Sequence, residues 1–156
     1  MILATHALTG AVIGKNIHDP LIIIAASLAI HYIMDSFRHG EYFDSRIASV
    51  RDTAWKIILD LSIGGIFLLA YLLYARPDLG ISKNILLGSF FSMLPDLLTV
   101  LYWKFHWKII YPFVKLNEFS HRYGRFPKFA PERQWTLRNA LNDIAISVTA
   151  IILIFL

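Results

Sequence analysis

Long apolar stretches with almost no charge are the feature of this sequence that most constrains its fold. Residues 20–30 and 144–156 carry no charged side chain, and residues 57–74 carry only Asp60. Such stretches favour helices that lie in a membrane, because a helix satisfies its own backbone hydrogen bonds there. The chain is 56% hydrophobic and 17% charged, with a mean hydropathy of +0.55, which is more apolar than a soluble domain. We therefore predict an all-α, polytopic membrane helix bundle that forms one domain over residues 1–156.

The apolar runs and the turns between them predict about five helices. Their expected bounds are 2–17, 20–38, 50–75, 82–104 and 132–156. The first helix is short for a span, which needs about 20 residues. Gly10 and Gly14 give it a small-xxx-small face that suits close contact with another helix. We also expect Pro95 to kink or unwind the fourth helix.

Basic residues concentrate in two segments, 36–56 and 103–138, which hold 12 of the 15 Lys and Arg residues. With five spans these segments lie on one side, and the positive-inside rule makes that side cytoplasmic. We therefore expect a bacterial inner (plasma) membrane protein, and the N-terminus lacks the features of a cleaved signal peptide. Aromatic residues within 103–135 are expected to anchor the chain at the lipid headgroups. The net charge of +4 fits contact with anionic lipid and does not indicate nucleic acid binding.

A polar motif follows the apolar run at residues 20–30, where His31, Asp35 and His39 stand at four-residue spacing. In an α-helix this spacing places the three side chains on one face. Two imidazoles and a carboxylate arranged in this way can bind a divalent cation. The alternative is the ordinary polarity of a helix end, with His39 in interfacial water.

Other histidines and aspartates fall near the cytoplasmic ends of the predicted helices. They are His6, Asp60, Asp96, His121 and Asp143. A carboxylate within a span costs about 2.5–3.5 kcal/mol unless it has a partner. Because the chain has no cysteine, a metal ion would be bound by His, Asp, Glu or backbone oxygen. The competing explanation for these residues is a proton relay or simple Asp–Arg and Asp–His pairs. Asp143 either supports the metal ligands or is simply a polar residue at the start of a helix. We interpret His18 and His106 as ordinary interfacial histidines.

Several short motifs resemble those of a known family. They are Thr5-His6-Ala-Leu-Thr-Gly10, His31-x-x-x-Asp35-x-x-x-His39, Leu59-Asp60, Leu94-Pro95-Asp96-Leu97 and Phe119-Ser120-His121-Arg122. In combination and order they resemble small bacterial membrane proteins that are similar to the membrane-bound metal-dependent hydrolases and, more distantly, to zinc-dependent phospholipase C. This chain lacks the family's second aspartate after Asp96 and its second histidine after Arg122, so the number of metal ions stays open.

Together with the spacing, this resemblance implies a metal centre that hydrolyses a phosphoester. The implied ligands are His6, His31, Asp35, Asp60, Asp96 and His121, with His39 on the rim. The implied metal is zinc, with manganese or iron as alternatives, and it would activate water. Asp60 would act as base, and Arg38 or Arg122 would clamp the phosphate of a phospholipid or polyprenyl phosphate. Two alternatives stay open: a non-catalytic metal- or proton-handling protein with a transport or binding site, and a purely structural helical protein.

Overall fold

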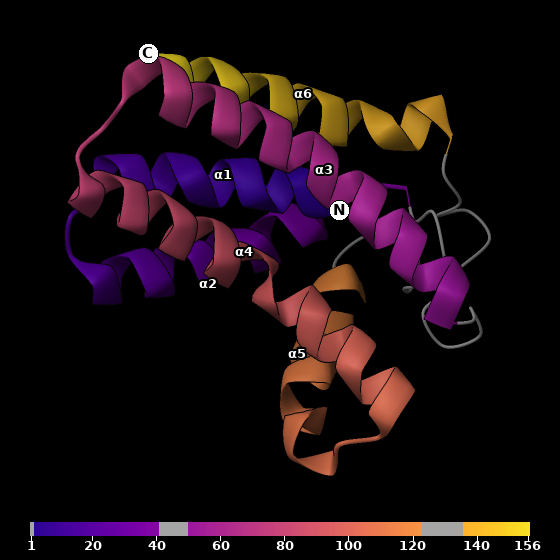
Figure 1. Cartoon of the computed structure of the whole chain (residues 1–156). Coiled ribbons are helices and arrows are strands. Elements are labelled where there is room, and N and C mark those ends of the chain that lie inside the picture. The colour runs from indigo at the N-terminus through magenta and orange to yellow at the C-terminus, as the bar shows by residue number, and fades with distance from the viewer. Residues whose placement is uncertain (1, 41–49, 123–135) are drawn as a thin grey trace.

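The computed structural model describes residues 2–40, 50–122 and 136–156. These residues form six α-helices and one 3₁₀ helix and contain no strand, which confirms the all-α class (Figure 1). The elements are α1 (Leu3–Asn16), α2 (Pro20–Ser36), α3 (Val50–Ala75), α4 (Leu79–Phe105), η1 (Lys108–Ile110), α5 (Tyr111–Arg122) and α6 (Leu137–Phe155).

Three of these helices are long and apolar enough to cross a membrane. They are α3 over Ala54–Ala75, α4 over Leu79–Phe105 and α6 over Leu137–Phe155. Helix α2 is apolar but shorter, with 17 residues. Large apolar side chains on these helices stay exposed, among them Ile66 on α3 and Ile152 on α6. Their exposure is consistent with lipid, rather than water, around the bundle.

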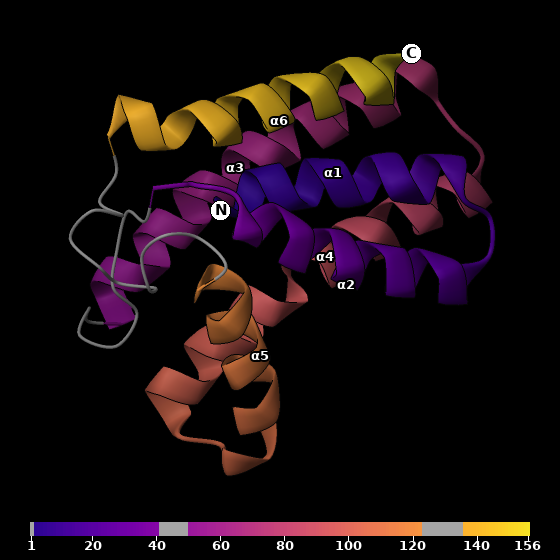
Figure 2. The same cartoon turned by 180° about the vertical axis from the view of Figure 1, so that it is seen from behind.

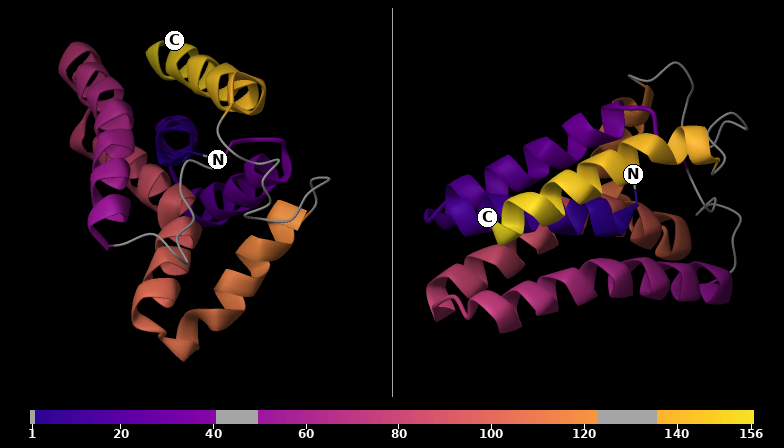
Figure 3. Two further views of the ribbon diagram at one scale, coloured as in Figure 1. Left: turned by 90° about the vertical axis from the view of Figure 1, so that its right-hand side faces the viewer. Right: turned by 90° about the horizontal axis from the view of Figure 1, so that it is seen from above.

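Helix α1 is the centre of the bundle and contacts α2, α3, α4 and α6. Figure 3 (left) shows it end-on with these four helices around it. Two glycines of α1 pack directly on α4, because a Cβ atom at Gly10 would collide with the backbone of Gly88, and one at Gly14 with the backbone of Asn84. The predicted close contact through Gly10 and Gly14 is therefore confirmed.

Two aspartates from other helices hold the first turn of α1. Asp60 on α3 accepts hydrogen bonds from the backbone N–H groups of Leu3 (2.6 Å) and Ala4 (3.1 Å). Asp143 on α6 accepts one from Ile2 (3.0 Å). The first N–H groups of a helix have no partner within the helix and form the positive end of its dipole, so carboxylates are favourable there. These bonds fix α1 against α3 and α6.

The helix count differs from the five predicted, because a sixth helix, α5, lies within the segment 103–135 that we expected to be only an interfacial connection. Helix α5 is amphipathic: Phe113, Leu116 and Phe119 are exposed, whereas Val114 and Asn117 are buried. A search for long apolar runs cannot find such a helix. Figures 1 and 2 show that α5 and the end of α4 project away from the other helices.

Several predicted bounds also change. Helix α4 begins at Leu79 rather than 82, with the Asp78 side chain accepting a hydrogen bond from the N–H of Ile81 (2.9 Å). It is helical through Pro95, and its axis changes direction part-way along (Figure 1). Helix α2 ends at Ser36 rather than 38. The start of the last helix was predicted at 132, which lies outside the described residues.

Candidate metal centre

Six of the seven predicted metal ligands lie together in the structure. They form two groups, one of His6, His31, Asp35 and Asp96 and one of Asp35, His39 and His121. Within each group, one ligand atom of every residue lies within 4.8 Å of the others. Asp35 belongs to both groups, so its carboxylate stands at the centre of the cluster. The residues come from α1, α2, α4, α5 and the segment after α2.

The imidazole Nε2 atoms converge on this carboxylate. Oδ2 of Asp35 lies 3.2 Å from Nε2 of His31 and 3.4 Å from Nε2 of His121. Oδ1 of Asp35 lies 3.2 Å from Nε2 of His6, which is also 3.7 Å from Oδ2 of Asp96. His31 and Asp35 share one face of α2, as the four-residue spacing predicts.

His39 reaches the cluster in a different way from the one predicted. Because α2 ends at Ser36 and Phe37 is extended, His39 does not continue the helical face. Its side chain is nevertheless grouped with Asp35 and His121. The residue is buried, so the expectation that it lies on the rim or in interfacial water is wrong.

Three of the four histidines are oriented by backbone carbonyls. Nδ1 of His31 lies 2.8 Å from the carbonyl of Ser92, Nδ1 of His39 lies 2.9 Å from that of Phe37, and Nδ1 of His121 lies 2.7 Å from that of Asn117. A carbonyl only accepts, so Nδ1 carries the proton in each case, and the neutral ring then has its lone pair on Nε2. Metal-binding histidines are commonly held in this way.

His6 supplies the clearest sign that the cluster suits a cation. Both of its ring nitrogens are buried and make no hydrogen bond of good geometry within the described residues, although Nε2 lies 3.2 Å from Oδ1 of Asp35. Its ring stacks on that of His31, with centroids 4.2 Å apart. A buried nitrogen without a hydrogen bond is costly, and a cation next to Nε2 would relieve this cost at one of the two nitrogens. Nitrogen and oxygen donors without sulfur fit zinc, manganese or iron.

The cluster is closed on most sides and reaches the surface through Asp96. His6, His31 and Asp35 are 0% exposed, whereas the Asp96 side chain is 19% exposed. A ligand or water molecule would therefore approach the cluster on the side of Asp96.

The remaining predicted site residues lie elsewhere. Both carboxylate oxygens of Asp60 accept backbone N–H groups of α1, and Asp60 is in neither group of ligands. Arg38 is exposed, and its Nε donates to Oδ1 of Asn139 (2.7 Å). Arg122 ends α5, but its side chain lies outside the described residues. His18 and His106 are exposed and in neither group.

The structure also reveals polar groups that the sequence analysis did not select. The carbonyl of Ser92 orients His31, and the fully buried side chain of Asn117 lies beside His31 and Asp96. Asn117 could have been found as part of a polar stripe, because it precedes His121 by one turn on the buried face of α5.

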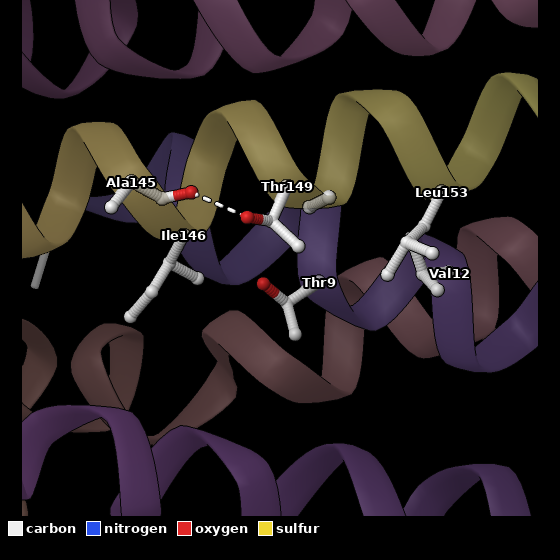
Figure 4. Close-up of a pocket in the computed structure, with 7 residues that line it drawn as sticks. Thr9, Val12, Ala145, Ile146, Thr149 and Leu153 are labelled. Carbon is white, nitrogen blue, oxygen red and sulfur yellow. Dashed lines mark hydrogen bonds between the residues drawn. The ribbon is translucent and has the colours of Figure 1, made fainter.

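A groove lies between α1 and α6, beginning one turn of α1 beyond His6 (Figure 4). It has a volume of about 230 Å³ and is lined by Val12, Ala145, Ile146, Ala150, Leu153 and two threonines, Thr9 and Thr149. Both threonine hydroxyls donate to carbonyls of their own helices, those of Thr5 (2.9 Å) and Ala145 (2.8 Å). Their hydrogen-bonding needs are met, so the groove suits a hydrocarbon chain better than a polar ligand.

Comparison with protein families, curated proteins and solved structures finds no match to this chain.

Proposed function

We propose that this protein is a membrane-embedded, metal-dependent hydrolase that acts on a lipid phosphoester at the cytoplasmic face of the bacterial inner membrane. The observation that carries the proposal is the convergence of three imidazole Nε2 atoms, from His6, His31 and His121, on the buried carboxylate of Asp35. Because Asp35 belongs to both groups of ligands, the cluster is suited to two ions that share this carboxylate.

A divalent metal of the zinc class supplies an activated water nucleophile and polarises a phosphoryl oxygen when it is bound. The chain's own residues have the other roles. His6, His31, His39 and His121 would bind through Nε2, and the backbone carbonyls behind three of them keep these rings in place. Asp96, at the open side, would bind and face the substrate. In the net reaction, the water oxygen bonds to phosphorus, the phosphorus–oxygen bond to the lipid breaks, and the lipid oxygen takes a proton.

Arg38 is the candidate for contact with the phosphate. Its Nε is held by Asn139 and its carbonyl accepts a hydrogen bond from Nδ2 of Asn142 (2.6 Å). The residue lies two positions after the end of α2 and directly before His39, and its side chain is exposed. A guanidinium that is held at Nε keeps its terminal N–H groups for phosphate oxygens. The contacts of Asp60 support capping of α1 rather than the predicted role as base.

A lipid substrate fits the surroundings of the cluster. Candidate spans α3, α4 and α6 pack against α1, which carries His6, and the groove between α1 and α6 offers space for a hydrocarbon chain. The distribution of Lys and Arg supports a cytoplasmic site. We therefore favour a phospholipid or polyprenyl phosphate over a soluble ester.

The test is hydrolysis by purified protein in detergent micelles that contain either lipid class, measured as release of phosphate from polyprenyl phosphate and of phosphorylated headgroup from phospholipid. The proposal predicts release by metal-loaded protein, loss of release after chelation, recovery with added zinc, and no release by the Asp35→Asn variant. Folded, metal-loaded protein that cleaves neither lipid class would contradict it.

Non-catalytic metal binding is the second candidate, and the burial of the cluster favours it. Five of the six clustered residues are at most 2% exposed, whereas catalytic sites keep an open position for substrate. This candidate predicts that the protein binds metal but hydrolyses neither lipid class, and that a chelator removes the metal only slowly.

A further inference from the structure

Asn117 is a fully buried, uncharged residue that lies among the candidate ligands. It stands on the inner face of α5, one turn before His121. Its side-chain nitrogen donates to Oδ1 of Asp96 (3.2 Å) and to Oγ1 of Thr99 (2.8 Å). Its backbone carbonyl orients His121. Asn117 therefore connects α5 with α4 at the edge of the cluster.

The orientation of this amide follows from its partners. The carboxylate of Asp96 only accepts hydrogen bonds, so the NH₂ group of Asn117 faces it. The hydroxyl of Thr99 already donates to the carbonyl of Pro95 (2.9 Å) and can only accept from Asn117. The carbonyl oxygen Oδ1 of Asn117 is consequently directed to the other side, where it lies 3.4 Å from Nε2 of His31.

That side of the amide faces other electron-pair donors. Nδ1 of His31 donates to the carbonyl of Ser92, so in the neutral ring Nε2 holds a lone pair. Oδ2 of Asp35 lies 3.2 Å from the same nitrogen. An amide oxygen, a carboxylate oxygen and an imidazole lone pair repel one another in a buried site unless a proton on Nε2 or a metal cation lies between them.

We infer that Asn117 is a further member of the metal centre, with its amide oxygen as a neutral ligand to the cation held by His31 and Asp35. Its amide nitrogen holds Oδ1 of Asp96 and so leaves Oδ2 facing His6. An amide oxygen adds a donor without adding negative charge. The inference rests on the proposed metal centre and assigns its third oxygen donor.

The test is a titration of the detergent-solubilised, metal-free protein with Co²⁺, whose visible absorption reports the number and geometry of its ligands. Two variants replace Asn117 with side chains of similar size. Asn117→Leu removes both polar atoms and should weaken Co²⁺ binding by about 10- to 100-fold. Asn117→Asp keeps an oxygen donor and should bind at least as tightly as wild type, with a shifted spectrum.

Asn84→Ala is the control, because the side-chain amide of Asn84 also donates a hydrogen bond, but to the backbone carbonyl of Ile17 at the other end of α4 (3.4 Å). It should leave affinity and spectrum unchanged. A purely structural role for Asn117 predicts lower thermal stability in both Asn117 variants with the wild-type Co²⁺ spectrum, and this result would overturn the inference while leaving the metal centre intact. Wild-type protein that binds no Co²⁺ would overturn the proposed function and this inference together.

Discussion

Nε2 of His121 lies 3.4 Å from Oδ2 of Asp35, so α5, which projects from the bundle, reaches a carboxylate that is buried at the end of α2. Asp35 also meets His6 from α1 and His31 from its own helix. Helices α1, α2 and α5 are thereby joined at one side chain. The same residue that holds them together would be shared by the two groups of ligands.

The first prediction concerns this shared position. Asp35→Asn removes the negative charge that both groups use, so it should lower bound metal more than Asp96→Asn, which affects one group only. Metal content per chain, measured by elemental analysis, checks the prediction. Asp78→Asn is the control, since Asp78 caps the start of α4 far from the cluster. Equal losses in Asp35→Asn and Asp96→Asn would argue against a shared carboxylate.

The second prediction separates capping from metal binding at Asp60. Asp60→Ala removes the acceptors for the N–H groups of Leu3 and Ala4 and should cost about 1–2 kcal/mol of stability. Metal affinity should change little in the protein that remains folded, because Asp60 lies outside both ligand groups. Thermal unfolding in detergent and a metal titration measure the two effects. Folded Asp60→Ala protein that has lost its metal would show that Asp60 is a ligand.

The third prediction concerns the contact between α1 and α4. Gly10→Ala places a Cβ atom against the backbone of Gly88, so the helices must separate and the melting temperature should fall. Gly65→Ala on α3 is the matched control, because a Cβ atom there meets nothing within 4 Å. It should leave stability unchanged or raise it by up to about 1 kcal/mol, since Ala favours helix over Gly. A melting temperature that falls equally in both variants would contradict this view of the interface.

The fourth prediction tests the groove between α1 and α6. Ala145→Phe fills part of the space that we assign to a lipid chain. It should raise KM for long-chain lipid phosphates and leave kinetics on a short-chain, water-soluble phosphoester unchanged, because the metal ligands are untouched. Steady-state kinetics with substrates of graded chain length provide the measurement. An equal effect on KM at every chain length would show that the groove does not bind the lipid chain.

The sequence was sufficient for the parts of the fold that depend on apolar runs. Helices α1 to α4 follow directly from such runs, and the four-residue spacing of His31 and Asp35 correctly placed both on one helical face. The same reasoning failed at His39, because spacing cannot tell where a helix ends. It also failed to find α5, whose apolar residues form one face rather than a continuous run.

Asp60 and Asn117 show why the candidate site could be predicted only in part. A carboxylate in an apolar helix needs a partner, but the sequence does not tell whether a cation or the N–H groups of another helix supply it. For Asp60 the structure shows the N–H groups of α1. Asn117 is uncharged and belongs to none of the sequence motifs. Only its contacts with Asp96 and His31 in the structure identify it as part of the candidate site.

The most direct test of the central claim is X-ray absorption at the zinc edge on protein loaded with zinc and freed of excess metal. The proposed metal centre predicts tightly bound zinc with a shell of nitrogen and oxygen atoms and the outer-shell scattering of imidazole rings, which should be reduced in His31→Ala and His121→Ala. Protein that retains no zinc, or zinc surrounded by oxygen without imidazole, would contradict the existence of this metal centre.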